Sequence, residues 1–416
     1  MKLFKIAIPF WQHWLQLYGE HPELATQSWA EQQATINRNW FGYPHAWKDA
    51  LEPLGYKVVE VLANVELVQK TWAAERSFAY DETTWKHDIL KGQILEFQPE
   101  ILFVADMFQF APEWIQSVRQ SCPSIRVVMG WCGGPWPNDA LFKAYDFTLS
   151  CVPEIVEILN GWGHRTFHLN HSFDPRILER LEMGRSPAID FSFIGNINRN
   201  SQFHVARDAT LERLVSEIDV EIFTLAFYTN DSLPTNARRI AKAQLFRLRQ
   251  RLMAAGLPTD WLDRLPLLKT VAQLEHPPRR AVNPRLKPFM QPPRFGMPMF
   301  QTLRDSRATF NSHIDLSANS ASNMRLFEAT GVGTCLVTDH KVNLNQLFES
   351  DREVLTYRSP DECLEKVKWV LAHPKQRDDI AQAGQARTLK EHTLATRAQQ
   401  LDEILQREMQ RSTVLV

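Results

Sequence analysis

Short apolar runs that alternate with helical patterns constrain the fold of this 416-residue chain more than any other feature. Helical periodicity separates most of these runs, as in residues 83–97 and 153–160. The runs that predict buried strands in the N-terminal part are residues 4–9, 57–62, 101–105, 126–129, 147–151 and 166–169. Strands joined by helices of this length form doubly wound parallel sheets with right-handed crossovers. We therefore predict an α/β fold.

A second alternating unit begins near residue 190. It predicts strands at 191–194 and 220–225 around a helix at 203–217, and the alternation resumes after residue 299. A chain of this length suits two α/β domains. We expect two Rossmann-like units facing across a cleft. The predicted boundaries are residues 1–172 for the first domain, 173–395 for the second and 396–416 for a terminal helix.

A basic, proline-rich segment of about residues 235–295 interrupts the second unit. Residues 238–294 hold thirteen Lys or Arg, three Asp or Glu, and eight of the 24 prolines. Residues 238–255 predict a basic helix, whereas 277–293 cannot be one regular element. Two interpretations stay open. The segment is either a solvent-exposed insertion in the domain, or a basic lid or platform that binds an anionic acceptor, a phospholipid surface or the donor phosphates. A net charge of −1 and the lack of a nucleic-acid motif argue against nucleic-acid binding.

Residues 320–339 predict a loop, a short helix, a Gly-x-Gly turn and a buried strand. Ser322 or Asn323 is expected to cap the helix. A helix start whose amide groups face a cleft is an anion site, and Arg325 adds a planar donor fork suited to phosphate. Glu328 could accept hydrogen bonds from a ribose diol. The segment therefore predicts a pocket for a nucleoside diphosphate.

This segment resembles the donor-binding half of GT-B glycosyltransferases of group 1, and in particular the CgeB-like (spore maturation) branch. The residues that match its signature are Asn323, Arg325, Phe327, Glu328 and Gly331. The resemblance is close over about residues 295–397. It implies that Glu328 holds the nucleotide ribose, and that Asn323, Arg325 and Gly331 belong to the donor site.

One position departs from the group 1 pattern. The family pairs two glutamates eight positions apart, and Ser320 stands where the first would fall. The residue that contacts the transferred sugar is therefore left open. A structural ion pair between Arg325 and Glu328, one helical turn apart, is an alternative to their donor-binding roles.

The resemblance implies a glycosyltransferase of the hexosyltransferase type. The donor would be a nucleoside-diphosphate sugar, used as substrate, with no cofactor and no metal. The acceptor would be a hydroxyl or other nucleophile of a glycan, glycolipid or protein, in surface polysaccharide, lipopolysaccharide or protein glycosylation. By analogy, residues 397–409 would form a helix that crosses back to the first domain.

Further donor-site candidates follow predicted strands of the second unit. Gly195 and Asn196 lie at a strand end that would face the cleft, where ligands bind in such folds. Arg199 and Arg207 are candidates for neutralising the diphosphate, and surface roles are the alternative for both. His313 follows the predicted strand 308–311, and a donor contact and a structural role stay equally open.

The first domain offers two candidate catalytic residues. Asp106 ends the predicted strand 101–105, where a carboxylate could take the proton of the acceptor hydroxyl or hold that hydroxyl. A helix cap is the alternative for Asp106. His13, just past the first predicted strand, is an alternative base.

Several features are missing from the sequence. It has no zinc-type His/Cys spacing, no phosphate-binding G-x-x-x-x-G-K-[ST] motif and no nucleophile elbow. The five cysteines and the lack of a signal pattern predict a cytoplasmic protein, with peripheral contact at the inner membrane face left open. The rival functions are a nucleotide-sugar epimerase, a non-catalytic sugar- or partner-binding protein, and a nicotinamide-dependent enzyme.

Overall fold

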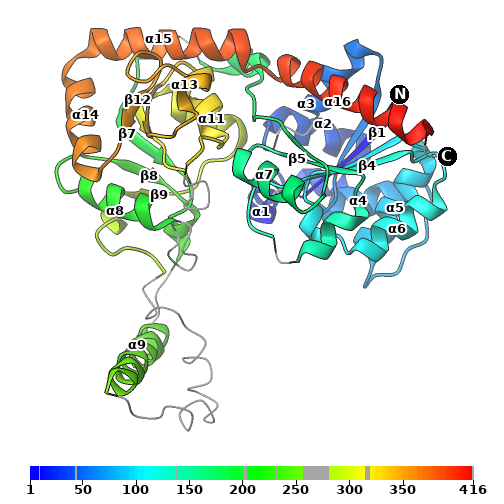
Figure 1. The fold of residues 1–416 in the computed structure, drawn as a ribbon, viewed down its shortest axis with the longest axis horizontal. Helices are drawn as coiled ribbons and strands as arrows, with labels where there is room; N and C mark the ends of the chain where they lie inside the picture. The colour runs from blue at the N-terminus through cyan, green and yellow to red at the C-terminus, as the bar shows by residue number, and fades with distance from the viewer. Residues whose placement is uncertain are drawn as a thin grey trace.

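Two parallel sheets, each with six strands, organise the described part of the chain. The computed structural model describes residues 1–8, 10–42, 45–136, 138–182, 184, 186–197, 199, 204–229, 233–255, 281–313 and 319–414. Figure 1 shows the two sheets in two separate bodies, with α15 above one and α16 above the other. The predicted α/β class with two Rossmann-like units is confirmed.

The first sheet has the strand order β2-β1-β3-β4-β5-β6. Its strands are β1 Lys2–Ala7, β2 Lys57–Leu62, β3 Ile101–Val104, β4 Val127–Trp131, β5 Phe147–Ser150 and β6 Thr166–His168. All four residues of β3 and of β5 are buried, as expected for parallel strands that are covered on both faces. The point where the winding reverses lies between β1 and β3.

The α-helices of this half are α1 Trp11–Glu20, α2 Trp29–Asn39, α3 Ala46–Leu51, α4 Glu66–Glu75, α5 Trp85–Phe97, α6 Pro112–Ser121 and α7 Pro153–Gly161. Local signals fix several of their starts. Ser28 and Glu31 form a capping box at α2. Pro112 and Pro153 occupy the first position of α6 and α7, where the missing proline N–H costs nothing.

The second sheet has the order β12-β11-β10-β7-β8-β9. Its strands are β7 Ile189–Ile194, β8 Glu221–Phe223, β9 Met290–Gln291, β10 Ser306–Phe310, β11 Cys335–Asp339 and β12 Leu355–Tyr357. The α-helices that accompany it are α8 Val205–Leu214, α9 Leu233–Ala254, α11 Gly296–Arg304, α12 Arg325–Gly331, α13 Leu344–Leu347, α14 Pro360–Ala372 and α15 Pro374–Glu391. Here the winding reverses between β7 and β10.

Helix α16, Leu394–Val414, packs on the first sheet although it follows the second in sequence. Leu401 and Leu405 join the same apolar cluster as Leu3 of β1. Tyr56 donates a hydrogen bond to Asp402 at 2.6 Å. The chain thus crosses between the two bodies twice, once near Phe173 and once near His392. The two crossing segments lie side by side, and the backbone N–H of Phe173 donates a hydrogen bond to the carbonyl of His392 (2.9 Å).

Most predicted strands shift by one or two residues at their ends, and two differences have a clear physical reason. The first strand, predicted at 4–9, begins earlier, at Lys2, because its backbone pairs with β2 from Lys2 opposite Lys57 onward. Lys5 is buried within this strand and forms an ion pair with Glu60 on β2 (2.7 Å). Strand β9 was not predicted, since it has two residues and ends at a pair of prolines. It lies at the sheet edge beside β8, where proline is tolerated.

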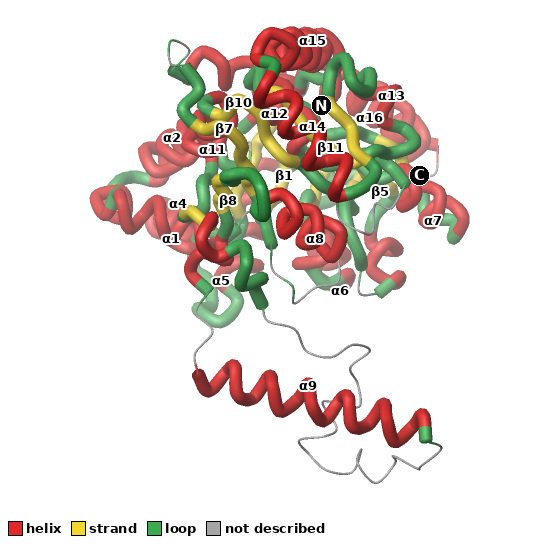
Figure 2. The backbone as a smooth tube through the Cα atoms, turned by 90° about the vertical axis from the view of Figure 1, so that its left-hand side faces the viewer, coloured by secondary structure: helices red, strands yellow, loops and turns green. Residues whose placement is uncertain are grey.

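Helix α9 stands apart from both sheets in two perpendicular views (Figures 1 and 2). It coincides with the predicted basic helix at 238–255 and begins five residues earlier than predicted. The following residues of the basic segment, 256–280, lie outside the described residues. Among the described helices, none combines the length and the apolar character needed to cross a bilayer.

Candidate functional site

Arg207 joins two loops at the point where the winding of the second sheet reverses. From α8 its guanidinium donates to the carbonyl of Asn196, which follows β7 (2.9 Å), and to that of Ser312, which follows β10 (2.6 Å). The residue is only 8% exposed and its charge lies 5.7 Å from the centre of the Phe193 ring. Arg207 therefore fixes the carboxyl edge of the sheet, where ligands bind in doubly wound folds.

The Gly195–Asn196 turn lies at this edge. The backbone N–H of Gly195 donates to the carbonyl of Phe223 on β8 (3.1 Å), and a Cβ at Gly195 would come within 2.8 Å of the Phe193 ring. Asn196 is exposed. The structure thus explains this glycine by a close approach to Phe193.

Arg199 is engaged by acidic residues. Its Nε donates to Asp208 of α8 at 2.9 Å, its Nη2 contacts the same carboxylate, and Glu212 lies 3.8 Å away. A guanidinium in such a cluster would have to exchange partners before it could bind a diphosphate. This geometry fits a structural ion-pair role, which differs from both the diphosphate contact and the surface role that the sequence predicted.

Arg325 and Glu328 form a buried ion pair at the start of α12. Arg325 Nη1 lies 2.9 Å from a carboxylate oxygen of Glu328, and Arg325 Nη2 donates to the carbonyl of Ile194 at the end of β7 (3.2 Å). Glu328 is 5% exposed. Burial raises the pKa of Glu328, and the nearby Arg325 charge opposes that rise. The pair ties α12 to the loop edge that Arg207 organises.

Asn323 does not cap α12, which corrects the expectation for Ser322 or Asn323. The residue preceding the helix is Met324, and no side chain caps the first turn. Instead, Asn323 Nδ2 donates to Asn311 Oδ1 after β10 (2.8 Å). Tertiary contact with a neighbouring loop therefore replaces the local cap.

His313 pairs with a residue that the sequence analysis missed, Asp339. His313 Nδ1 lies 2.7 Å from Asp339 Oδ1, and the backbone N–H of His313 donates to the same oxygen (3.1 Å). Lys341 Nζ approaches the other carboxylate oxygen at 3.2 Å. Although burial opposes it, contact with His313 and Lys341 holds the pKa of Asp339 well below its ordinary value. The available signal was a carboxylate at the end of a buried strand, which had identified Asp106.

Gly331 at the end of α12 faces the interior. A Cβ there would lie 2.3 Å from the Phe173 ring, at the crossing between the two bodies. Its carbonyl accepts a hydrogen bond from Gln385 of α15 (2.9 Å). Packing against Phe173 accounts for this glycine without a ligand.

Asp106 occupies the reversal point of the first sheet. It follows β3, and its carboxylate accepts a hydrogen bond from the backbone N–H of Ile8, which follows β1 (2.8 Å). Its side chain makes no cap to the next helical turn. Burial raises the pKa of Asp106, although the bond from Ile8 and the Lys5 charge act against the rise.

His13 lies in an aromatic contact between the two bodies. Its ring centre is 4.2 Å from that of Phe41 and 5.3 Å from that of Phe295, which precedes α11. The residue is 4% exposed, and burial lowers its pKa to about 4, with partial compensation from nearby Asn39. A base must reach its acceptor, and in this arrangement aromatic rings cover His13. The geometry favours a packing role over the predicted catalytic one.

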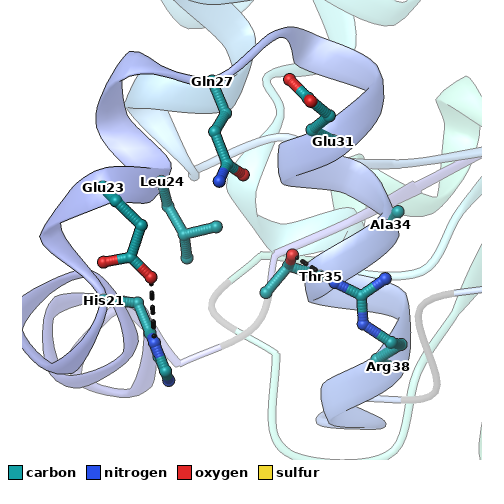
Figure 3. A pocket seen from close by; sticks show the side chains of 8 residues that line it. All are labelled: His21, Glu23, Leu24, Gln27, Glu31, Ala34, Thr35 and Arg38. Carbon is teal, nitrogen blue, oxygen red and sulfur yellow. Dashed lines mark hydrogen bonds and ion pairs between the residues drawn. The ribbon is translucent and has the colours of Figure 1, made fainter.

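A surface cavity of about 560 Å³ lies elsewhere on the first body, between α2 and the preceding 3-10 turn Pro22–Thr26. Figure 3 shows polar side chains around it, including the contact between His21 and Glu23. None of the predicted site residues lines it. Across the described ranges, no group of three or more His, Cys, Asp or Glu side chains is arranged to hold a metal ion.

The later part of the chain resembles a known protein family. Residues 287–403, which include Asn323, Arg325, Glu328 and Asp339, match a protein family described as "Glycosyl transferase-like". No curated protein matches the chain.

Solved structures resemble the whole chain. A glycosyltransferase from Rickettsia africae ESF-5 has a TM-score of 0.53 at 7% identity, with 98% of each chain covered. Sucrose-phosphate synthase from Thermosynechococcus elongatus has a TM-score of 0.53 at 8% identity, again with 98% of each chain covered. Anabaena HepE in complex with UDP and glucose has a TM-score of 0.51 at 10% identity, covering 98% of this chain and 99% of HepE. At such identities the similarity shows the fold alone, which is GT-B-like.

Proposed function

We propose that this protein is a glycosyltransferase that uses a nucleoside-diphosphate sugar as donor. The observation that carries the proposal is the buried Arg325–Glu328 pair at the reversal point of the second sheet. This pair lies inside the segment that matches the glycosyl transferase-like family. A buried carboxylate with a raised pKa beside a guanidinium is costly for folding, and such arrangements gather at functional sites. The N-x-R-x-F-E signature of the CgeB-like branch, present as Asn323, Arg325, Phe327 and Glu328, supports the finer family assignment.

The chemistry follows from these residues. On donor binding, Glu328 would exchange part of its pairing with Arg325 for ribose hydroxyl groups, and Arg325 would turn toward the diphosphate. A guanidinium is suited to the charge that develops on the leaving nucleotide. The acceptor would lie against the first domain, with Asp106 taking its proton. The reaction would need no metal.

Hydrolysis of the donor tests this proposal against its rivals. Purified protein is incubated with radiolabelled UDP-glucose or GDP-mannose, with and without a glycolipid extract, and free sugar and labelled lipid are separated. A transferase releases sugar slowly without acceptor and labels the acceptor when it is present. An epimerase would instead yield a new nucleotide sugar. A sugar-binding protein would leave the donor intact, which would refute the proposal.

Helix α9 supports a membrane-associated acceptor. It carries six Lys or Arg and no Asp or Glu, and Ile240 and Leu248 on it are about half exposed. Basic residues near an anionic bilayer contribute roughly 1 kcal/mol each, and exposed apolar side chains can enter the headgroup region. We therefore propose that α9 holds the enzyme at an anionic phospholipid surface, where a glycolipid acceptor would be at hand.

Vesicle sedimentation tests the role of α9. We expect binding to phosphatidylglycerol-containing vesicles, weakened strongly in the double variant Arg247→Glu/Arg251→Glu. The matched control is Arg352→Glu, an exposed charge reversal on the second body. Equal binding of wild type to neutral and anionic vesicles would contradict the proposal.

A further inference from the structure

Helix α9 carries a surface hollow that contains none of the candidate donor-site or catalytic residues. Its volume is about 620 Å³, within the range of roughly 300–1,000 Å³ that is usual for small-ligand sites. The described residues that line it are Ala241, Gln244, Leu245, Arg247, Leu248 and Arg251. Because α9 stands apart from both sheets (Figures 1 and 2), the hollow is separate from the edge of the second sheet.

Two arginines form one side of this hollow. Arg247 and Arg251 are four positions apart on α9, so their side chains leave the same face of the helix one turn apart. Both residues are exposed, and within the described part of the chain neither side chain makes an ion pair or a hydrogen bond. Helix α9 contains no Asp or Glu that would neutralise them. The pair therefore offers two positive charges with planar donor forks, which suit phosphate oxygens.

Apolar side chains form the other side of the hollow. Ala241, Leu245 and Leu248 follow one another at spacings of four and three positions, which makes them a continuous stripe along the helix. By the same helical geometry, the uncharged Gln244 lies between this stripe and the arginines. Leu248 is 49% exposed. The hollow thus has a cationic side and an apolar side, which together match an amphiphile with an anionic head and a hydrocarbon chain.

We propose that the hollow on α9 binds single molecules of a lipid whose head is a terminal phosphate group, with the phosphate on Arg247 and Arg251 and the chain on Leu245 and Leu248. The charge balance favours this head. A terminal phosphate carries about −1.5 to −2 near neutral pH, which matches two guanidinium groups, whereas a phosphodiester head carries a single charge. The inference rests on the proposed role of α9 at a phospholipid surface and deepens it by naming the headgroup.

Calorimetric titration of the full chain with soluble probes gives the first test. The probes are dihexanoyl phosphatidic acid, dihexanoyl phosphatidylglycerol and inorganic phosphate, with both lipids below the concentration at which they form micelles. Phosphatidic acid should bind at one site. Inorganic phosphate should bind at least tenfold more weakly, since each buried methylene group strengthens binding about fourfold. Equal affinity for inorganic phosphate would identify a free phosphate as the ligand, and equal affinity for the phosphodiester lipid would refute the headgroup assignment.

Charge-reversal variants test whether the site or only the net charge of α9 matters. Arg247→Glu/Arg251→Glu should weaken binding of phosphatidic acid at least a hundredfold, because each hydrogen bond to a charged group contributes roughly tenfold or more. The matched control is Arg238→Glu/Lys242→Glu, which reverses two exposed charges on the same helix outside the hollow. The control should bind within about threefold of wild type, since salt screens charges that do not touch the ligand. Equal losses in the two variants would refute the site.

The apolar side has its own test. Leu248 is half exposed, so Leu248→Gln should fold normally. It should bind phosphatidic acid roughly tenfold more weakly than wild type and inorganic phosphate equally well. Unchanged affinity for phosphatidic acid would refute the placement of the chain. Displacement of phosphatidic acid by an equal concentration of a glutamate-rich peptide would identify an acidic protein segment as the occupant instead of a lipid.

Donor hydrolysis without vesicles, measured on the same preparations, separates this inference from the function on which it rests. A protein that binds phosphatidic acid and leaves every nucleotide sugar intact would refute the glycosyltransferase proposal and keep the lipid site. A protein that hydrolyses a donor and does not bind phosphatidic acid would refute the lipid site alone. Sedimentation with phosphatidylglycerol vesicles without binding of the short-chain phosphatidic acid would show that α9 recognises only surface charge, which also refutes the site.

Discussion

The ion pair between Arg325 and Glu328 gives the sharpest test of the physical reasoning. Replacing Arg325 with Met keeps the length of the side chain and removes its charge. Glu328, 5% exposed, then keeps an ionised carboxylate in the interior without a partner. Breaking a buried pair from one side costs about 3–5 kcal/mol. Because the Arg325 side chain retains 16% exposure, we expect a loss near the lower end, about 3 kcal/mol at pH 8.

The loss should depend on pH with a defined sign. Burial raises the pKa of Glu328 above its unfolded value, so the folded state holds the proton to a higher pH than the unfolded chain. The contribution of Glu328 is therefore favourable at low pH and is lost as pH rises through the raised pKa. Without Arg325 that pKa rises further. Arg325→Met should thus lie closer to wild type at pH 5 than at pH 8.

Urea unfolding of four proteins measures these effects. The double variant Arg325→Met/Glu328→Leu removes both charges and should lie within about 1 kcal/mol of wild type, since an apolar pair can replace a buried ion pair. Arg352→Met, in the exposed pair with Glu349 at the same spacing, should cost at most about 0.5 kcal/mol. If the double variant is as unstable as Arg325→Met at pH 8, the loss does not come from an unpaired carboxylate, and the account of this site is wrong.

Three further predictions concern Asp106, His13 and Gly331. Asp106→Asn should lower turnover roughly 10²–10⁴-fold. Because burial raises the pKa of Asp106, the wild-type rate should begin to fall, as the pH is lowered, at a pH above the ordinary pKa of an aspartate. An unchanged pH–rate profile in the variant would exclude Asp106 as the base. As the pH falls from 6.5 to 4, His13→Phe should lose less stability than wild type. The pKa of His13 is lowered in the folded protein, so the unfolded chain binds the proton at a higher pH than the folded protein does. Parallel pH–stability curves of the two proteins would contradict this. Gly331→Ala should lower the free energy of unfolding by about 1–3 kcal/mol, because its methyl group meets the Phe173 ring. Gly19→Ala has open space around the new methyl group and should not destabilise the protein. Equal melting temperatures of the two variants would refute the packing argument.

Local patterns were enough to predict most elements of the fold. The strand predicted at 57–62 has those bounds, and the helices at 83–97 and 153–160 differ by two residues or fewer at their ends. Buried apolar runs and proline at helix starts are local signals, so they can be read without the fold. Strand β9 could not be predicted, because two residues before a pair of prolines carry no strand pattern. Only their pairing with β8 makes these two residues a strand.

The candidate site was less accessible from the sequence because its contacts are between distant segments. Arg325 and Glu328 were identified from one helical turn, and their pairing was foreseen as an alternative. The contact of Asn323 with Asn311 and that of His313 with Asp339 arise only when β10 and β11 lie side by side. The placement of His13 against Phe295 likewise depends on how the two bodies meet.

Thermal stabilisation by nucleotides is the most direct test of the central claim, that the edge of the second sheet binds a nucleotide-sugar donor. Wild type and the Arg325→Met/Glu328→Leu variant are melted with UDP, GDP, ADP and dTDP and with a sugar derivative of each. The account predicts that one nucleotide raises the melting temperature of wild type and leaves the equally folded variant unchanged. No shift in wild type with any nucleotide, or the same shift in both proteins, would contradict it.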